Sequence, residues 1–236
     1  MQKAFHTSWR RAIAFSLMAL LPVMLLGSIA TVKAQDTKSN RLNLSDFRTR
    51  QNKTKSVDNV DNTVRSASPD TVFTNPAAIV LDDSGPALLY PSNITVSGLT
   101  GTVTDVNVTM NGFSHTFPDD VAILLVSPDG RKFILQSDVG GGTDVTNVTY
   151  TFDDQATASI GNSGPFPATG TSVKPSSVGD DDEMDPPAPA GPYNQPAPAG
   201  SATLNGTFGG AAPNGVWQLF VTDFFLGDSG TFAGGW

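Results

Sequence analysis

Residues 103–136 read VTDVNVTMNGFSHTFPDDVAILLVSPDGRKFILQ, and they contain three apolar segments separated by two turns. In the first segment Val106, Val108 and Met110 alternate with polar residues, which is the period-2 pattern of a strand with one buried face. Residues 121–126 are apolar without interruption, so we expect a strand that is covered on both faces. The Ser-Pro-Asp-Gly that follows predicts a turn before a returning strand. This stretch therefore predicts antiparallel β-structure.

The rest of residues 69–236 carries the same signals. Short apolar or alternating runs are bounded nearly everywhere by Gly, Pro, Asn or Asp. We expect eight or nine short antiparallel strands in an all-β jelly-roll β-sandwich, with Trp217, Leu219 and Val221 on one core-facing side of their strand. The strands are expected near residues 77–81, 93–97, 103–111, 121–127, 132–136, 147–152, 203–208, 216–222 and 231–236.

Residues 1–34 have the three parts of a secretory signal peptide. Lys3, Arg10 and Arg11 form a basic region, an apolar run follows, and a small-residue cleavage site ends at Ala34. An uncleaved anchor is the alternative, because the apolar run is close to the roughly 20 residues that span a bilayer. We favour cleavage, since a proline and a glycine interrupt the run. The chain is then secreted, extracellular or at the cell surface, with no membrane attachment.

Charge divides the remaining chain into two parts. Residues 35–68 are polar and hold seven Lys or Arg against four Asp, a net +3, which predicts a flexible tether. A grip on an anionic surface is the alternative reading. Residues 69–236 hold three Lys or Arg against 18 Asp or Glu, a net −15, so nucleic acid is not an expected partner. The chain has no cysteine, and an exported domain must then rely on its core or on bound metal.

Residues 161–202 interrupt the strand pattern with a Pro/Asp-rich loop. This loop contains an acidic run at residues 180–183 and the pentapeptide Pro-Ala-Pro-Ala-Gly at residues 187–191 and again at 196–200. A connection of this length inside a domain is typical of a functional or flexible loop. Consecutive carboxylates repel one another, so we expect the acidic run to be solvated rather than to bind calcium.

Residues 227–230, Gly-Asp-Ser-Gly, match part of the nucleophile motif of chymotrypsin-like serine proteases. That mechanism needs a base, and His115 is the only histidine that remains once the signal is removed. Its flanking residues do not fit, and Asp120 follows it by only five residues. We therefore expect no catalytic and no cofactor-binding residues. The motif is expected to link two strands, and His115 to hold its own loop by hydrogen bonds.

Four stretches resemble the P domain (P/Homo B domain) of kexin- and furin-like proprotein convertases, above all its bacterial secreted form. They are residues 107–130, 151–156, 208–219 and 223–236, so the resemblance covers roughly residues 75–236. It implies a galactose-binding-like jelly roll that packs beside a subtilisin-like catalytic domain and influences its calcium and pH dependence. We expect no such domain before this module, because residues 35–68 are predicted to be a tether. The resemblance also implies one more strand after the Gly-Trp, so we expect either a fragment or a curtailed last strand that leaves an open edge.

Calcium is the cofactor that we expect, because hard cations take oxygen ligands from carboxylates and turn carbonyls. The hypothetical ligands lie at predicted strand ends within the matching motifs. The alternative is that these aspartates form turns by accepting backbone N–H groups. They are Asp119, Asp120, Asp153, Asp154, Asp223 and Asp228.

The expected function is that of a secreted, non-catalytic P-domain module with a stabilising or protein-interaction role. Its expected partner is a secreted protease domain, or a protein or glycan of the cell surface. One alternative is a carbohydrate- or surface-binding jelly roll, because long loops often form binding sites. The other is a fragment or accessory part of a secreted serine endopeptidase.

Overall fold

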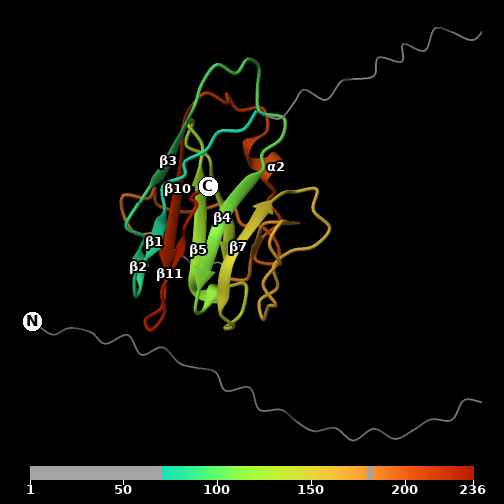
Figure 1. Ribbon diagram of the computed structural model, residues 1–236. Coiled ribbons are helices and arrows are strands. Elements are labelled where there is room, and N and C mark those ends of the chain that lie inside the picture. The colour runs from blue at the N-terminus through green and yellow to red at the C-terminus, as the bar shows by residue number, and fades with distance from the viewer. Residues whose placement is uncertain (1–70, 180–182) are drawn as a thin grey trace, which may run out of the picture. The chain divides into compact units, whose positions relative to one another are not determined.

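The computed structural model describes residues 71–179 and 183–236 (Figure 1). The predicted signal peptide and tether, and most of the acidic run at 180–183, lie outside the described residues. Within the described part of the chain, no helix has the length and apolar character needed to cross a membrane.

The described residues form two β-sheets, and the prediction of an all-β sandwich is confirmed (Figure 1). The first sheet has the order β1-β11-β4-β7-β8. Its strands are β1 (Ile79–Leu81), β11 (Gly230–Phe232), β4 (Val108–His115), β7 (Val145–Phe152) and β8 (Thr171–Val173). The second sheet has the order β2-β10-β5-β6-β9, and β3 also pairs with β10. Its strands are β2 (Gly85–Pro86), β3 (Ser92–Val96), β5 (Val121–Val126), β6 (Lys132–Ser137), β9 (Ser176–Ser177) and β10 (Gly215–Asp223).

Strand β5 is buried on both faces, as its continuous apolar sequence predicts. One face, with Ile123 and Leu125, packs in the main core between the two sheets. The other face, with Leu124, packs in a second cluster with Met184 and Ala188. Those two residues belong to the predicted Pro/Asp-rich loop. The described part of this loop therefore covers the outer face of the second sheet.

The main core also contains the three residues predicted to share one face of their strand. Trp217 is 7% exposed, and Leu219 and Val221 are fully buried. Aromatic rings fill the core near the end of β4, where Phe113 stacks on Phe232 with ring centroids 4.5 Å apart. The period-2 pattern therefore places these side chains correctly.

The strand predicted at residues 203–208 is wrong, because these residues form helix α2 (Leu204–Phe208). The hydroxyl of Thr203 accepts a hydrogen bond from the N–H of Gly206 at 2.9 Å. The carboxylate of Asp154 accepts the first two N–H groups of the helix at 3.0 and 2.8 Å. These acceptors satisfy donors that a helix start leaves without intrahelical partners. The cap from Asp154 comes from a distant part of the sequence and has no local signal.

Two further strand predictions need correction. The strand expected over residues 103–111 begins only at Val108, because the backbone of Val103 bonds to Ala211 and the N–H of Val106 donates to the side chain of Asn205. The strands are not all antiparallel, since β7 pairs with β8 and β6 with β9 in parallel. Strands β2, β8 and β9 are two or three residues long, which is too short to give a periodic signal.

Candidate functional site

One end of the sandwich gathers a histidine and several carboxylates. Here β4 ends, the short 3-10 helix η1 (Pro118–Asp120) leads into β5, and β10 ends before the turn into β11. We call this region the acidic end, and it is defined by Asp119, Asp120, Asp223 and Asp228. The residues come together because β11 and β10 pair with β4 and β5, respectively.

His115 is buried at the acidic end and is held at both ring nitrogens. Its Nε2 lies 3.0 Å from Oδ2 of Asp223, and its Nδ1 accepts the N–H of Phe117 at 3.1 Å. Nδ1 therefore carries no proton, and Nε2 donates its proton to Asp223. This arrangement agrees with the predicted role of His115, which is to hold its loop by hydrogen bonds.

The Gly-Asp-Ser-Gly motif links β10 to β11 beside His115. Ser229 is exposed, and its backbone N–H donates to the hydroxyl of Thr116 at 3.3 Å. The hydroxyl of Thr116 in turn donates to Asp228 at 2.8 Å. A serine nucleophile needs a base with a free ring nitrogen, and neither nitrogen of His115 is free. Among residues 71–179 and 183–236, His115 and Ser229 therefore do not have the geometry of a serine-protease triad.

The carboxyl of Asp120 is the most perturbed acid at this end. Burial raises its pKa to about 7, and repulsion from Asp223, Asp228, Asp119 and Asp138 adds to the effect. The residue itself is only 8% exposed. Protonation of Asp120 therefore falls near neutral pH.

Two neighbouring carboxyls are also shifted upward. Burial raises the pKa of Asp223, although hydrogen bonds from the N–H of Phe225 and from His115 act in the opposite direction. Burial likewise raises the pKa of Asp119, whose Oδ1 is buried without a hydrogen-bond partner. The acidic end therefore holds several carboxyls whose ionised forms are disfavoured.

The six predicted calcium ligands do not form one site. Asp119, Asp120, Asp223 and Asp228 lie at the acidic end, whereas Asp153 and Asp154 follow the far end of β7, beside α2. Asp154 caps α2, and Asp153 accepts the N–H of Gln155 at 2.7 Å, so this pair has the alternative role of forming turns and caps.

Within residues 71–179 and 183–236, no three His, Asp or Glu side chains form a preformed metal-ligand cluster. Calcium binding stays a prediction, and the four aspartates of the acidic end are the predicted ligands that lie together.

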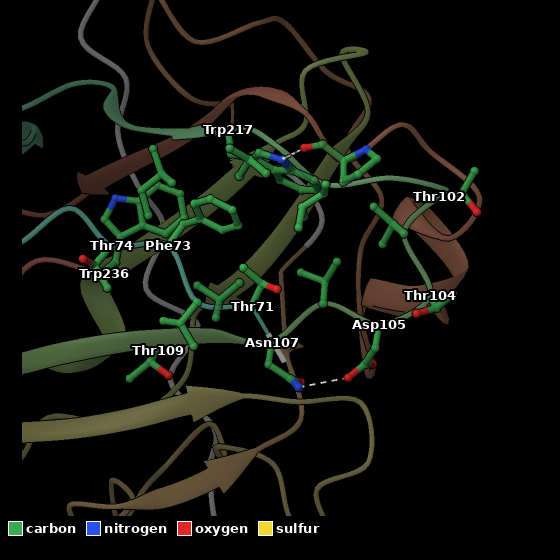
Figure 2. Close-up of a pocket in the computed structure, with 18 of the residues that line it drawn as sticks. Thr71, Phe73, Thr74, Thr102, Thr104, Asp105, Asn107, Thr109, Trp217 and Trp236 are labelled. Atoms are coloured by element: carbon green, nitrogen blue, oxygen red, sulfur yellow. Dashed lines mark hydrogen bonds between the residues drawn. The ribbon is translucent and has the colours of Figure 1, made fainter. Parts of the chain in front are cut away.

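The second candidate site is a groove of about 670 Å³ (Figure 2). Its lining includes the apolar side chains of Ile94, Val96, Val106 and Trp217. Polar side chains line it as well, and they include Thr71, Thr74, Thr102, Thr104, Asp105, Asn107 and Thr109. The groove therefore combines apolar surface with hydroxyl and amide groups.

The two tryptophans that line the groove are largely buried and expose little of their rings to solvent. Trp217 and Trp236 are 7% and 9% exposed. Their indole N–H groups donate to the carbonyl of Pro213 and to the hydroxyl of Ser92 at 2.9 Å each. Little ring face is left on which a sugar could stack. The groove thus gives no specific support to the carbohydrate-binding alternative.

The groove residues are absent from the sites predicted by sequence. Thr71 and Phe73 lie far from Asn107 and Thr109 along the chain, and only sheet pairing brings them together. The one available signal is the alternation of residues 106–110, which marks a strand but does not show that its residues line a groove.

Comparison with known proteins gives one partial match. Leupeptin-inactivating enzyme 1 of Streptomyces exfoliatus is 36% identical over 99 residues, which are 40% of this chain and 21% of that enzyme. The chain thus matches about one fifth of the length of this curated relative. No family model and no solved structure matches the chain. The resemblance to the P domain therefore stays a prediction, while a weak relationship to part of this enzyme is a finding.

Proposed function

We propose that this chain is a secreted, non-catalytic β-sandwich module of the P-domain kind, which stabilises or docks a peptidase. The observation that carries the proposal is the size of the shared part. A segment that makes up 21% of leupeptin-inactivating enzyme 1 accounts for 40% of this chain. A shared segment of this size is typical of an accessory module that recurs beside different partners.

The acidic end supports the non-catalytic part of the proposal. His115 is not available as a base for Ser229, because both of its ring nitrogens are engaged by Asp223 and Phe117. His115 and Asp223 are fully buried at their side chains, so a substrate does not reach them. These groups serve the fold, since they fix the end of β4 against the end of β10.

A chimeric enzyme tests the proposal. In leupeptin-inactivating enzyme 1, the matched 99 residues are deleted in one variant and replaced by the matched residues of this chain in another. We expect the deletion to lower the melting temperature and the yield of active enzyme, and the replacement to restore both. A deletion variant as stable and active as the parent contradicts a stabilising role.

The isolated chain provides the second arm of this test. We expect it neither to inactivate leupeptin nor to react with a serine-directed fluorophosphonate, with a Ser229→Ala variant as the matched control. Labelling that disappears in the Ser229→Ala variant contradicts the non-catalytic assignment and favours the serine endopeptidase alternative.

A further inference from the structure

The turn that joins β10 to β11, residues 224–229, holds two large apolar side chains in solvent (Figure 1). Phe225 is 56% exposed and Leu226 is 78% exposed. Phe224, the residue before them, instead packs against the second cluster on the outer face of the second sheet. Burial is the main contribution that apolar side chains make to stability, so the sandwich gains little from Phe225 and Leu226.

Hydrogen bonds from other parts of the chain fix the backbone of this turn. Four of its N–H groups donate to acceptors that lie in η1, at the end of β10, in the turn after β1 and just after β4. The donor and acceptor residues are Phe224 with Asp120, Phe225 with Asp223, Gly227 with Asp83, and Ser229 with Thr116. A backbone held in this way has little freedom to lose when it binds a partner. The turn is therefore a pre-organised support for its two exposed side chains.

The charges around the turn are all of one sign. Among residues 71–179 and 183–236, the Lys and Arg residues are Arg131, Lys132 and Lys174. They lie at the other end of the sandwich, because Lys132 pairs with the end of β5 and Lys174 follows the residue of β8 that pairs with the end of β7. The carboxyls at the end that carries the turn include Asp82, Asp83, Asp119, Asp120, Asp144 and Asp228. This end therefore favours a positively charged partner surface and disfavours an anionic membrane.

The partial match indicates what lies next to such a module. The matched residues make up 21% of leupeptin-inactivating enzyme 1, so most of that enzyme is chain joined to the matched segment. Contacts between domains of one chain resemble protein–protein interfaces, whose centres bury apolar and aromatic side chains. The neighbouring part of a peptidase is thus the partner that fits an exposed apolar turn on this module.

We propose that residues 224–229 are the surface by which this module docks its peptidase, and that the complementary surface is an apolar pocket rimmed by Lys and Arg. Phe225 and Leu226 enter the pocket, and the carboxylates of Asp82, Asp83 and Asp228 face its rim. Buried aromatic and aliphatic anchors within a polar rim carry most of the energy of stable interfaces. This inference rests on the proposed function, because it names the contact surface of the module with its peptidase.

Chimeric enzymes test the role of the turn. Residues 71–236 of this chain replace the matched 99 residues of leupeptin-inactivating enzyme 1, and the half-life of activity at a raised temperature is measured. We expect Phe225→Ser together with Leu226→Ser to shorten this half-life about 10-fold, because both anchors are lost. Leu88→Ser is the matched control, since it removes a 70% exposed apolar side chain outside the turn. It should change the half-life less than about 2-fold.

Thermal unfolding of the isolated full chain separates docking from folding. The two side chains are exposed there, so the double variant should melt within about 2 °C of the wild type. Equal destabilisation of the isolated chain and of the chimera would show that Phe225 and Leu226 stabilise the sandwich itself, and it would overturn the inference.

Charge reversal tests the basic rim. Asp82 is exposed beside the turn, so Asp82→Lys should shorten the half-life of the chimera about 3- to 10-fold at low salt, whereas Asp82→Glu should preserve it. The difference between these two variants should disappear at about 0.5 M salt, because salt screens exposed charges. Equal half-lives at low salt would contradict a rim of Lys and Arg.

The chimeras also distinguish failure of this inference from failure of the proposed function. If the chimera with the wild-type turn is no more stable than the deletion variant, the proposed function fails and this inference fails with it. If that chimera is stable and the double variant is equally stable, only the inference fails. Flotation of the full chain with phosphatidylcholine vesicles, lost in the double variant, would assign the turn to a membrane surface and would also overturn the inference.

Discussion

Replacing Asp120 by asparagine should raise stability at neutral and alkaline pH and leave it unchanged in acid. The carboxyl is buried among Asp223, Asp228, Asp119 and Asp138, and its pKa is raised from 3.8 to about 7. Between these two pH values the folded protein keeps a proton that the unfolded chain releases. The free energy of unfolding therefore falls as pH rises from about 4 to about 7, and this contribution is constant above pH 7.

The size of the effect follows from the shift in pKa. Each pKa unit corresponds to about 1.4 kcal/mol, so a shift from 3.8 to about 7 sets an upper limit of about 4 kcal/mol. Asp119 and Asp228 are only partly buried, so water and salt screen their repulsion of Asp120, which reduces the expected gain to about 1–2 kcal/mol. For a domain of this size, that gain corresponds to a rise in melting temperature of about 2–8 °C.

Thermal unfolding in the presence of a chelator checks this prediction. Wild-type protein and Asp120→Asn are compared between about pH 4 and pH 8. Asp82→Asn is the matched control, because it removes the same charge at an exposed position. The variant and the wild type should melt together at the acid end of the range and separate as pH rises. A constant difference across the range, or an equal gain from Asp82→Asn, would refute the reasoning.

Three further predictions concern the same residues and their supports. Calcium at millimolar concentration should raise the melting temperature of the wild type, since a ligand bound only to the folded state stabilises that state. The rise should be smaller in Asp120→Asn. Melting curves that coincide with calcium and with chelator would remove calcium as a cofactor. His115→Ala should cost about 3 kcal/mol of stability in chemical denaturation, because it leaves Oδ2 of the buried Asp223 without its side-chain donor, and an unchanged denaturation midpoint would contradict that role. Asp154→Ala should lower the free energy of unfolding by about 1–2 kcal/mol through loss of the α2 cap. Asp153→Ala should have a smaller effect, because it leaves only one exposed N–H group without its acceptor. Equal losses would contradict the assignment of the cap to Asp154.

The strands could be predicted wherever a pattern of apolar and polar side chains extends over several residues. The alternation around Val108 and Met110, and the continuous apolar run from Val121 to Val126, each describe how a strand meets its neighbours, and the structure buries them as expected. Strand β8 and helix α2 are short and depend on contacts with distant residues. The mistaken strand at residues 203–208 shows this, because the N–H groups of α2 are capped by Asp154 about 50 residues earlier.

The candidate site could be predicted only in part. The crowding of His115, Asp119 and Asp120 within one short stretch marks the acidic end in the sequence. The sequence does not show that Asp223 accepts a hydrogen bond from His115, because these residues are 108 positions apart and meet only through the two sheets. The six aspartates predicted as one ligand set lie at two opposite ends of the sandwich, which the sequence does not show.

The amino-acid sequence by itself determined the all-β class of the domain and which faces of its longer strands are buried. It did so because side-chain periodicity and turn chemistry are local properties of each strand. Tertiary structure alone decided the raised pKa of Asp120 and the groove that Phe73 and Thr109 line together. Both depend on which strand edges and strand ends lie side by side, and that is set by the packing of the whole sandwich rather than by any one segment.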